Sequence, residues 1–126
     1  MSEKKDPYRL EVEIPGLPKT TNAGGRAHWS AKVKEARHWI EMVALVTAGK
    51  RPRSPLPKVK LTLTRYSSRE PDYDGCVSTF KHVIDGLVHA RIITDDKISN
   101  IGSPTYCWVE AKPNQGKVRV IVEEVS

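Results

Sequence analysis

The sequence predicts an α/β (α+β) fold in which a small mixed sheet is covered by two helices. Two observations predict it: four segments have the alternation or composition of strands, and two segments carry apolar residues at helical spacing. Along the chain they follow the order β-α-β-α-β-β. The length of 126 residues fits one domain, residues 1–126, and the apolar (38%) and charged (29%) contents are typical of a folded chain.

The first half of the chain contains two predicted strands with a helix between them. Residues 8–14 and 58–66 alternate polar and apolar side chains, which is typical of half-buried strands. Ser30 is expected to cap a helix that ends at Gly49, and a proline-rich connector, residues 50–57, follows it. The apolar stripe of this helix is expected to contain Val33, Ala36, Ile40, Val43, Ala44 and Thr47, with Trp39 packed at its edge.

The second half contains the other helix and two further strands. Residues 98–111 indicate an irregular strand, and residues 117–125 alternate strongly after a turn. Lys81 is expected to be half-buried at the border of the helix, either near the preceding aspartates or in a salt bridge with Asp85 one turn on. The apolar arc of this helix is expected to contain Cys76, Val77, Phe80, Val83, Ile84, Leu87 and Val88.

The charge of the chain is unevenly distributed. Residues 1–66 hold 14 Lys and Arg against 6 Asp and Glu, whereas residues 67–126 hold 7 against 9. A basic half suits a phosphate backbone, although it could equally be a solubilising surface. In the loop around Gly24-Gly25, the donors Lys19, Asn22 and Arg26 are candidate DNA contacts; the alternative is an ordinary surface turn.

Five of the six aspartates lie within residues 69–101. Asp72 and Asp74, at the extended end of a predicted strand, would leave the same face roughly 6–7 Å apart, and the Asp95–Asp96 pair would open the next strand. Gathered carboxylates repel by about 4 kcal/mol per pair at 4 Å and an effective dielectric constant near 20. We therefore expect a divalent cation among them.

Other classes of site and location are disfavoured. The four histidines form no i, i+4 pair for a helical zinc site, and the chain has no phosphate-binding P-loop and no dinucleotide-type glycine motif. Cys76 and Cys107 are far apart and are expected to be reduced, packed thiols. No apolar run is long enough for a membrane span and residues 1–7 are polar, so we expect no membrane association and a cytoplasmic location.

The central segment resembles the RusA family of Holliday-junction resolvases. The resemblance is carried by Asp72-Tyr-Asp74, by Lys81 with Asp85 four residues on, by Gly86-Leu87, and by Ile93-Thr-Asp95-Asp96. It implies that Asp72, Asp74 and Asp96 are metal-binding catalytic carboxylates, with Asp95 a less certain fourth ligand. It further implies that Lys81 is a catalytic or DNA-contacting lysine and that Asp85 is structural. The chain departs from the family pattern at Gly75, where Asn is usual, and in the longer spacing between Asp74 and Lys81.

The resemblance also implies an activity, a cofactor and an assembly. The expected activity is Mg²⁺-dependent hydrolysis of DNA at four-way junctions, with Mn²⁺ as a possible substitute, by a homodimer that makes two symmetric nicks. Two alternatives stay open. The chain could be a catalytically inactive DNA-binding module in which the aspartates are helix caps, with Asp74 capping the helix at Gly75, or a metal nuclease that acts on other branched or single-stranded DNA.

Overall fold

The fold is organised by a four-stranded mixed sheet in the part of the chain that the structure, a computed structural model, describes: residues 7–17 and 27–125, with the backbone alone for residues 27–32. The strands are β1 (Arg9–Pro15), β2 (Val59–Ser67), β3 (Thr105–Glu110) and β4 (Lys117–Glu124), in the spatial order β1-β4-β2-β3. β4 pairs antiparallel with both β1 and β2, whereas β2 and β3 are parallel.

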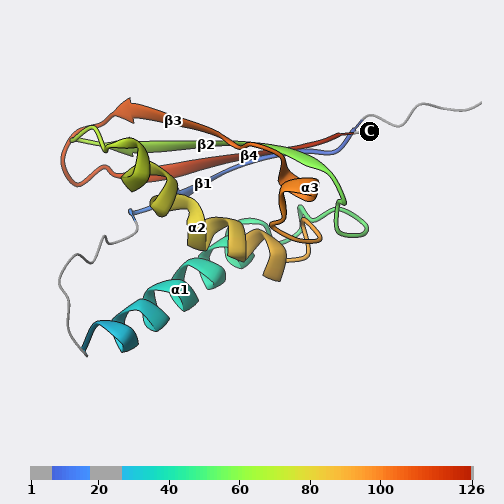
Figure 1. Ribbon diagram of the computed structural model, residues 1–126, viewed down its shortest axis with the longest axis horizontal. Coiled ribbons are helices and arrows are strands. Elements are labelled where there is room, and N and C mark those ends of the chain that lie inside the picture. The colour runs from blue at the N-terminus through green and yellow to red at the C-terminus, as the bar shows by residue number, and fades with distance from the viewer. Residues whose placement is uncertain (1–6, 18–26, 126) are drawn as a thin grey trace, which may run out of the picture.

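Two long helices cover one face of this sheet, and no described helix covers the other face (Figure 1). α1 (Ala27–Val46) lies against β1, and α2 (Tyr73–His89) lies against β2 and β3 and packs closely on α1. Because α2 connects two parallel strands, it runs back from the carboxyl ends of β2 and β3 to their amino ends. The predicted α+β fold, a mixed sheet covered by two helices, is confirmed.

The core follows from the alternation in the strands. Val59, Leu61 and Leu63 of β2 are buried against the helices. Every second side chain of β1 and of β4 is buried in the same core. The open face is charged instead: Glu13 of β1 accepts hydrogen bonds from Lys117 and Arg119 of β4. One buried face and one solvated face are what an antiparallel-dominated sheet needs in a small domain.

The first helix differs from its prediction in start and rotation. It begins at Ala27, so Ser30 lies inside its first turn and is not the N-cap. Val33, expected in the apolar stripe, is exposed, whereas Trp39 is fully buried and donates its indole N–H to Glu35. A single indole buries more apolar surface than a valine, which favours this rotation of the helix.

Residues 98–111, which were expected to form one irregular strand, form a short helix and then a strand. A short helix, α3 (Ile98–Ile101), precedes β3 and ends at Gly102, whose φ is 59°. Asn100 of α3 donates its side-chain amide to Pro57 O and Thr94 Oγ1, which attaches this turn to the start of β2.

Within the described residues, no helix combines the length and apolar character that crossing a bilayer requires.

Candidate metal and nucleic-acid site

The carboxyl ends of β2 and β3 and the start of α2 form one region, which we call the carboxyl edge. Ser67 and Glu110, the last residues of the two parallel strands, are register partners, and residues 68–72 lead from β2 into α2. In open sheets with parallel strands, ligands bind outside the carboxyl ends of those strands. The carboxyl edge is therefore where the topology favours a binding site.

Asp72 and Asp74 lie at this edge, but not on a strand. β2 ends at Ser67, Asp72 is the N-cap of α2, and Asp74 is in the first turn of that helix. The prediction of two carboxylates on one face of an extended strand is wrong, because the helix begins three residues earlier than the pattern indicated. Both side chains are nevertheless exposed, so both remain accessible to a ligand.

The cap of α2 depends on the glycine that departs from the family pattern. Asp72 Oδ1 accepts the N–H of Gly75 over 2.7 Å. A Cβ atom at position 75 would lie only 2.7 Å from that same oxygen. A side chain at this position would therefore require the Asp72 carboxylate to shift.

Asp95 and Asp96 lie at the opposite end of α2. They occupy a loop between Ile93, which bridges to Leu56 just before β2, and α3, so the prediction that they open a strand is wrong. The backbone N–H of Asp96 donates to Asp95 Oδ1, and this bond lowers the pKa of the Asp95 carboxyl. α2 has 17 residues, so the two pairs of aspartates are separated by about 25 Å of helix.

The four aspartates therefore do not converge within one chain. Among the described residues, no three acidic, histidine or cysteine side chains are grouped closely enough to hold a metal ion. The Asp72–Asp74 pair still has the donor chemistry that Mg²⁺ requires, because this ion takes one or two carboxylates and completes its coordination with waters and phosphate oxygens. Both carboxylates are exposed and oxygen is their only donor, which is the ligand chemistry that a hydrated divalent ion takes.

Lys81 is exposed on α2, which corrects the expectation that it is half-buried. Among the described side chains no ion pair joins it to Asp85. It lies seven residues after Asp74, which is two helical turns, so the two side chains are on the same face of α2. The other candidate DNA contacts, Lys19, Asn22 and Arg26, lie outside the described residues.

Beneath the start of α2 lies a group of polar and aromatic side chains that the sequence analysis missed. Arg65 of β2 donates to Thr79 Oγ1 of α2 and to Ser67 Oγ, and Trp108 of β3 donates its indole N–H to the same Ser67 oxygen. Tyr106, two residues before Trp108, contacts Tyr73 of α2. Arg65 breaks the polar–apolar alternation of its strand, and that break was the available signal.

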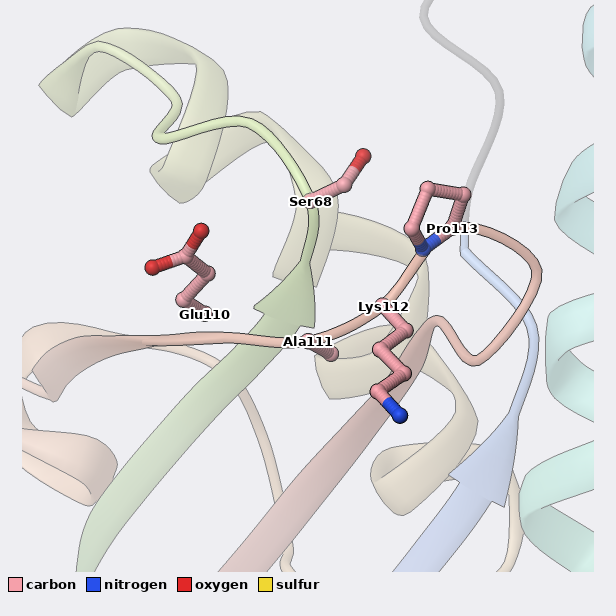
Figure 2. Close-up of a pocket in the computed structure, with 5 residues that line it drawn as sticks. All are labelled: Ser68, Glu110, Ala111, Lys112 and Pro113. Atoms are coloured by element: carbon pink, nitrogen blue, oxygen red, sulfur yellow. The ribbon is translucent and has the colours of Figure 1, made fainter.

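The described residues of the carboxyl edge have two further features, a hollow and a buried thiol, and neither brings reactive side chains together. A hollow of about 350 Å³ is lined by Ser68, Glu110, Ala111, Lys112 and Pro113. Figure 2 shows that these side chains do not converge, because Lys112 points away from Ser68 and Pro113. Cys76 is buried under the start of α2, and this burial raises the pKa of its thiol, so it is a poor nucleophile or metal ligand.

Comparison with known proteins does not identify the chain: no protein-family model matches it, and no curated protein is significantly similar to it.

Proposed function

We propose that the chain is a Mg²⁺-dependent endodeoxyribonuclease that resolves four-way DNA junctions by paired symmetric nicks. Mn²⁺ is expected to replace Mg²⁺, and the enzyme is expected to act in the cytoplasm as a homodimer. One observation carries the proposal: exposed Asp72 and Asp74 lie at the carboxyl edge, with exposed Lys81 on the same face of α2. The resemblance of the segment around them to RusA resolvases supports it.

In this mechanism Asp72 and Asp74 would hold the ion at the start of α2. A bound divalent ion would supply positive charge to a phosphate oxygen and lower the pKa of an attacking water. Lys81, about 10 Å further along the helix axis, would attract the DNA backbone and share charge that develops on the phosphate. Asp72 keeps its second oxygen, Oδ2, outside the cap hydrogen bond, because the Gly75 N–H is donated to Oδ1.

In a homodimer, the two aspartate pairs that lie far apart within one chain would come together from different protomers. The aspartate pairs lie at the two ends of α2, and Lys81 is midway between Tyr73 and His89. A two-fold axis across the middle of α2 would place the Asp72–Asp74 end of one protomer beside the Asp95–Asp96 loop of its partner. Two such sites related by symmetry suit two symmetric nicks.

The test is the Asp74→Asn variant with a labelled four-way junction. We expect loss of cleavage in Mg²⁺, with junction binding preserved or tightened, because the variant removes a negative charge and leaves the fold unchanged. Cleavage is followed on denaturing gels, and binding by gel shift in Ca²⁺. The matched control is Asp85→Asn, further along the same helix, which should cleave like the wild type. An Asp74→Asn variant that cuts at the wild-type rate contradicts the proposal.

A DNA-binding module without catalysis is the second candidate. The observation that favours it is the capping role of Asp72, since an N-cap explains one of the two aspartates without any ion. Such a module would shift a labelled junction on a gel without nicking it in either Mg²⁺ or Mn²⁺.

A further inference from the structure

An exposed aromatic side chain stands between the two aspartates of the carboxyl edge. Tyr73 is the first residue of α2, and it is 72% exposed. Aromatic rings gain free energy when they leave water, so an exposed ring between the two carboxylates of the proposed site is a candidate contact residue.

The ring of Tyr73 is supported from below. It meets Tyr106 of β3 edge to face, with ring centroids 6.2 Å apart and an interplanar angle of 83°. Tyr106 in turn contacts Phe80 of the core, with centroids 6.1 Å apart. Tyr73 thus has one edge-to-face partner on the protein side, and most of its ring is exposed on the other side. A ring with a packing partner loses less conformational freedom when a ligand binds than a ring without one.

The surroundings of Tyr73 favour a flat ligand over a protein. Its neighbours along the chain, Arg69, Glu70, Asp72 and Asp74, are all exposed and charged. The centres of protein–protein interfaces are depleted of charged residues, so this surface is a poor interface core. Stacking on a nucleobase needs only one open ring face. The acidic side chains around Tyr73 would repel the DNA backbone unless a divalent ion offsets their charge, so the stacking role depends on the ion proposed above.

We propose that Tyr73 stacks on an unpaired nucleobase next to the phosphate that is cut. The position of this base next to the cut phosphate rests on the proposed nuclease function. The inference also specifies which DNA the enzyme should prefer. The favoured DNA contains an unpaired base at or beside a branch point, and a fully paired duplex lacks the group that Tyr73 binds.

The experiment measures binding in Ca²⁺ by fluorescence anisotropy. Three DNAs are compared: a duplex, a fully paired four-way junction, and the same junction with one unpaired 2-aminopurine at its branch point. We expect Tyr73→Ala to weaken binding to the last of these about 5- to 100-fold, from the usual contribution of one stacked base. Duplex binding should change less than 2-fold, and the 2-aminopurine fluorescence that the wild type quenches should recover.

Two variants control for folding and for exposure in general. Tyr73→Phe keeps the ring and should bind within about 2-fold of the wild type, since stacking does not need the hydroxyl. Leu45→Ala, at an equally exposed apolar residue of α1, should leave all three affinities unchanged. The melting temperature and oligomeric state of each variant are measured alongside.

The outcomes separate this inference from the nuclease proposal. An equal loss on all three DNAs, a change of oligomeric state in Tyr73→Ala, or no binding to any DNA overturns the stacking role. If the wild type binds the unpaired base through Tyr73 but never cuts in Mg²⁺ or Mn²⁺, the nuclease proposal fails and the binding role stands. If Asp74→Asn abolishes cleavage while Tyr73→Ala binds like the wild type, the stacking role fails and the nuclease proposal stands.

Discussion

Asp72 illustrates how one side chain can serve both the fold and the chemistry. Its carboxylate caps α2 through the N–H of Gly75, and it is also one of the two exposed acids of the carboxyl edge. These roles make different demands: the cap needs an oxygen acceptor, whereas a metal ligand needs a negative charge. Substitutions that keep one property and remove the other therefore separate them.

We predict that Asp72→Ala and Asp72→Asn have different stabilities and the same loss of activity. Alanine removes the cap and should lower the free energy of unfolding by about 1 kcal/mol, whereas asparagine caps nearly as well. Both variants should lose junction cleavage because both lose the charge. Chemical denaturation and the nicking assay measure the two effects. Wild-type cleavage by Asp72→Asn would assign this residue to the cap alone.

Glu13 gives a prediction about acid stability. Hydrogen bonds from Arg119 and Lys117 lower the pKa of its carboxyl below its ordinary value of 4.5. A lowered pKa in the folded state means that the ionised group stabilises the protein above about pH 4.5 and that this contribution is lost as the pH falls below it.

The stability of the wild type should therefore fall more steeply below pH 4.5 than that of Glu13→Gln. The melting temperature is measured from pH 7 down to pH 3. The matched control is Glu110→Gln, which removes an exposed carboxylate that forms no ion pair within the described residues. Parallel profiles for the wild type and Glu13→Gln would show that the ion pairs on the open face contribute nothing measurable, as is common for exposed pairs.

At the scale of elements, the contact between α1 and α2 decides why position 86 is glycine. A Cβ atom at Gly86 would lie 2.8 Å from Val43 Cγ2 and 2.9 Å from Val43 Cβ. Gly in a helix costs about 1 kcal/mol relative to Ala, so propensity alone would favour alanine here. The close approach of the two helices outweighs propensity.

We predict that Gly86→Ala lowers the free energy of unfolding by about 1–3 kcal/mol, the usual cost of overpacking a core. Val43→Ala also destabilises, but the double variant should be more stable than the sum of the two single effects indicates, because each change relieves the other. Ser78→Ala, on the exposed side of the same helix, is the control and should be neutral or slightly stabilising. Additive effects in the double variant would contradict the contact.

For the whole molecule, the decisive fact is that α2 separates the two aspartate pairs. A site that needs both pairs would have to be shared between protomers, and mixing inactive variants tests this. In a mixed dimer of Asp74→Asn and Asp96→Asn protomers, one shared site carries both substitutions and the other carries neither.

We predict that mixing these two inactive variants restores nicking to roughly a quarter of the wild-type rate per protomer, since half of the random dimers are mixed and each has one intact site. The single-strand nicking rate is measured after the two proteins have exchanged subunits. Mixing Asp74→Asn with Asp72→Asn is the control: Asp72 and Asp74 lie in the same half of the shared site, so both sites of the mixed dimer carry one substitution and nicking should not be restored. No recovery in the first mixture would place each site within one chain.

The strands and both long helices could be predicted from the sequence because the spacing of apolar residues along each element reflects which side chains are buried. The alternation predicted for β2 and β4 agrees with the observed strands to within one residue at each end, and the apolar arc of α2 lies inside the observed helix. Boundaries set by caps were harder. Asp72 caps α2 before its apolar arc starts, and α3 is a single turn held by Asn100. No periodic pattern of apolar residues therefore marks the start of α2 or the presence of α3.

The sequence by itself determined the class of fold, the paired carboxylates and the basic charge of the first half of the chain. Only the tertiary structure decided that the two aspartate pairs lie at opposite ends of α2, that exposed Tyr73 packs against half-buried Tyr106, and that Gly86 is needed where two helices meet. The physical reason is that periodicity reports which side of an element is buried. It does not report which distant residues that element brings together or keeps apart.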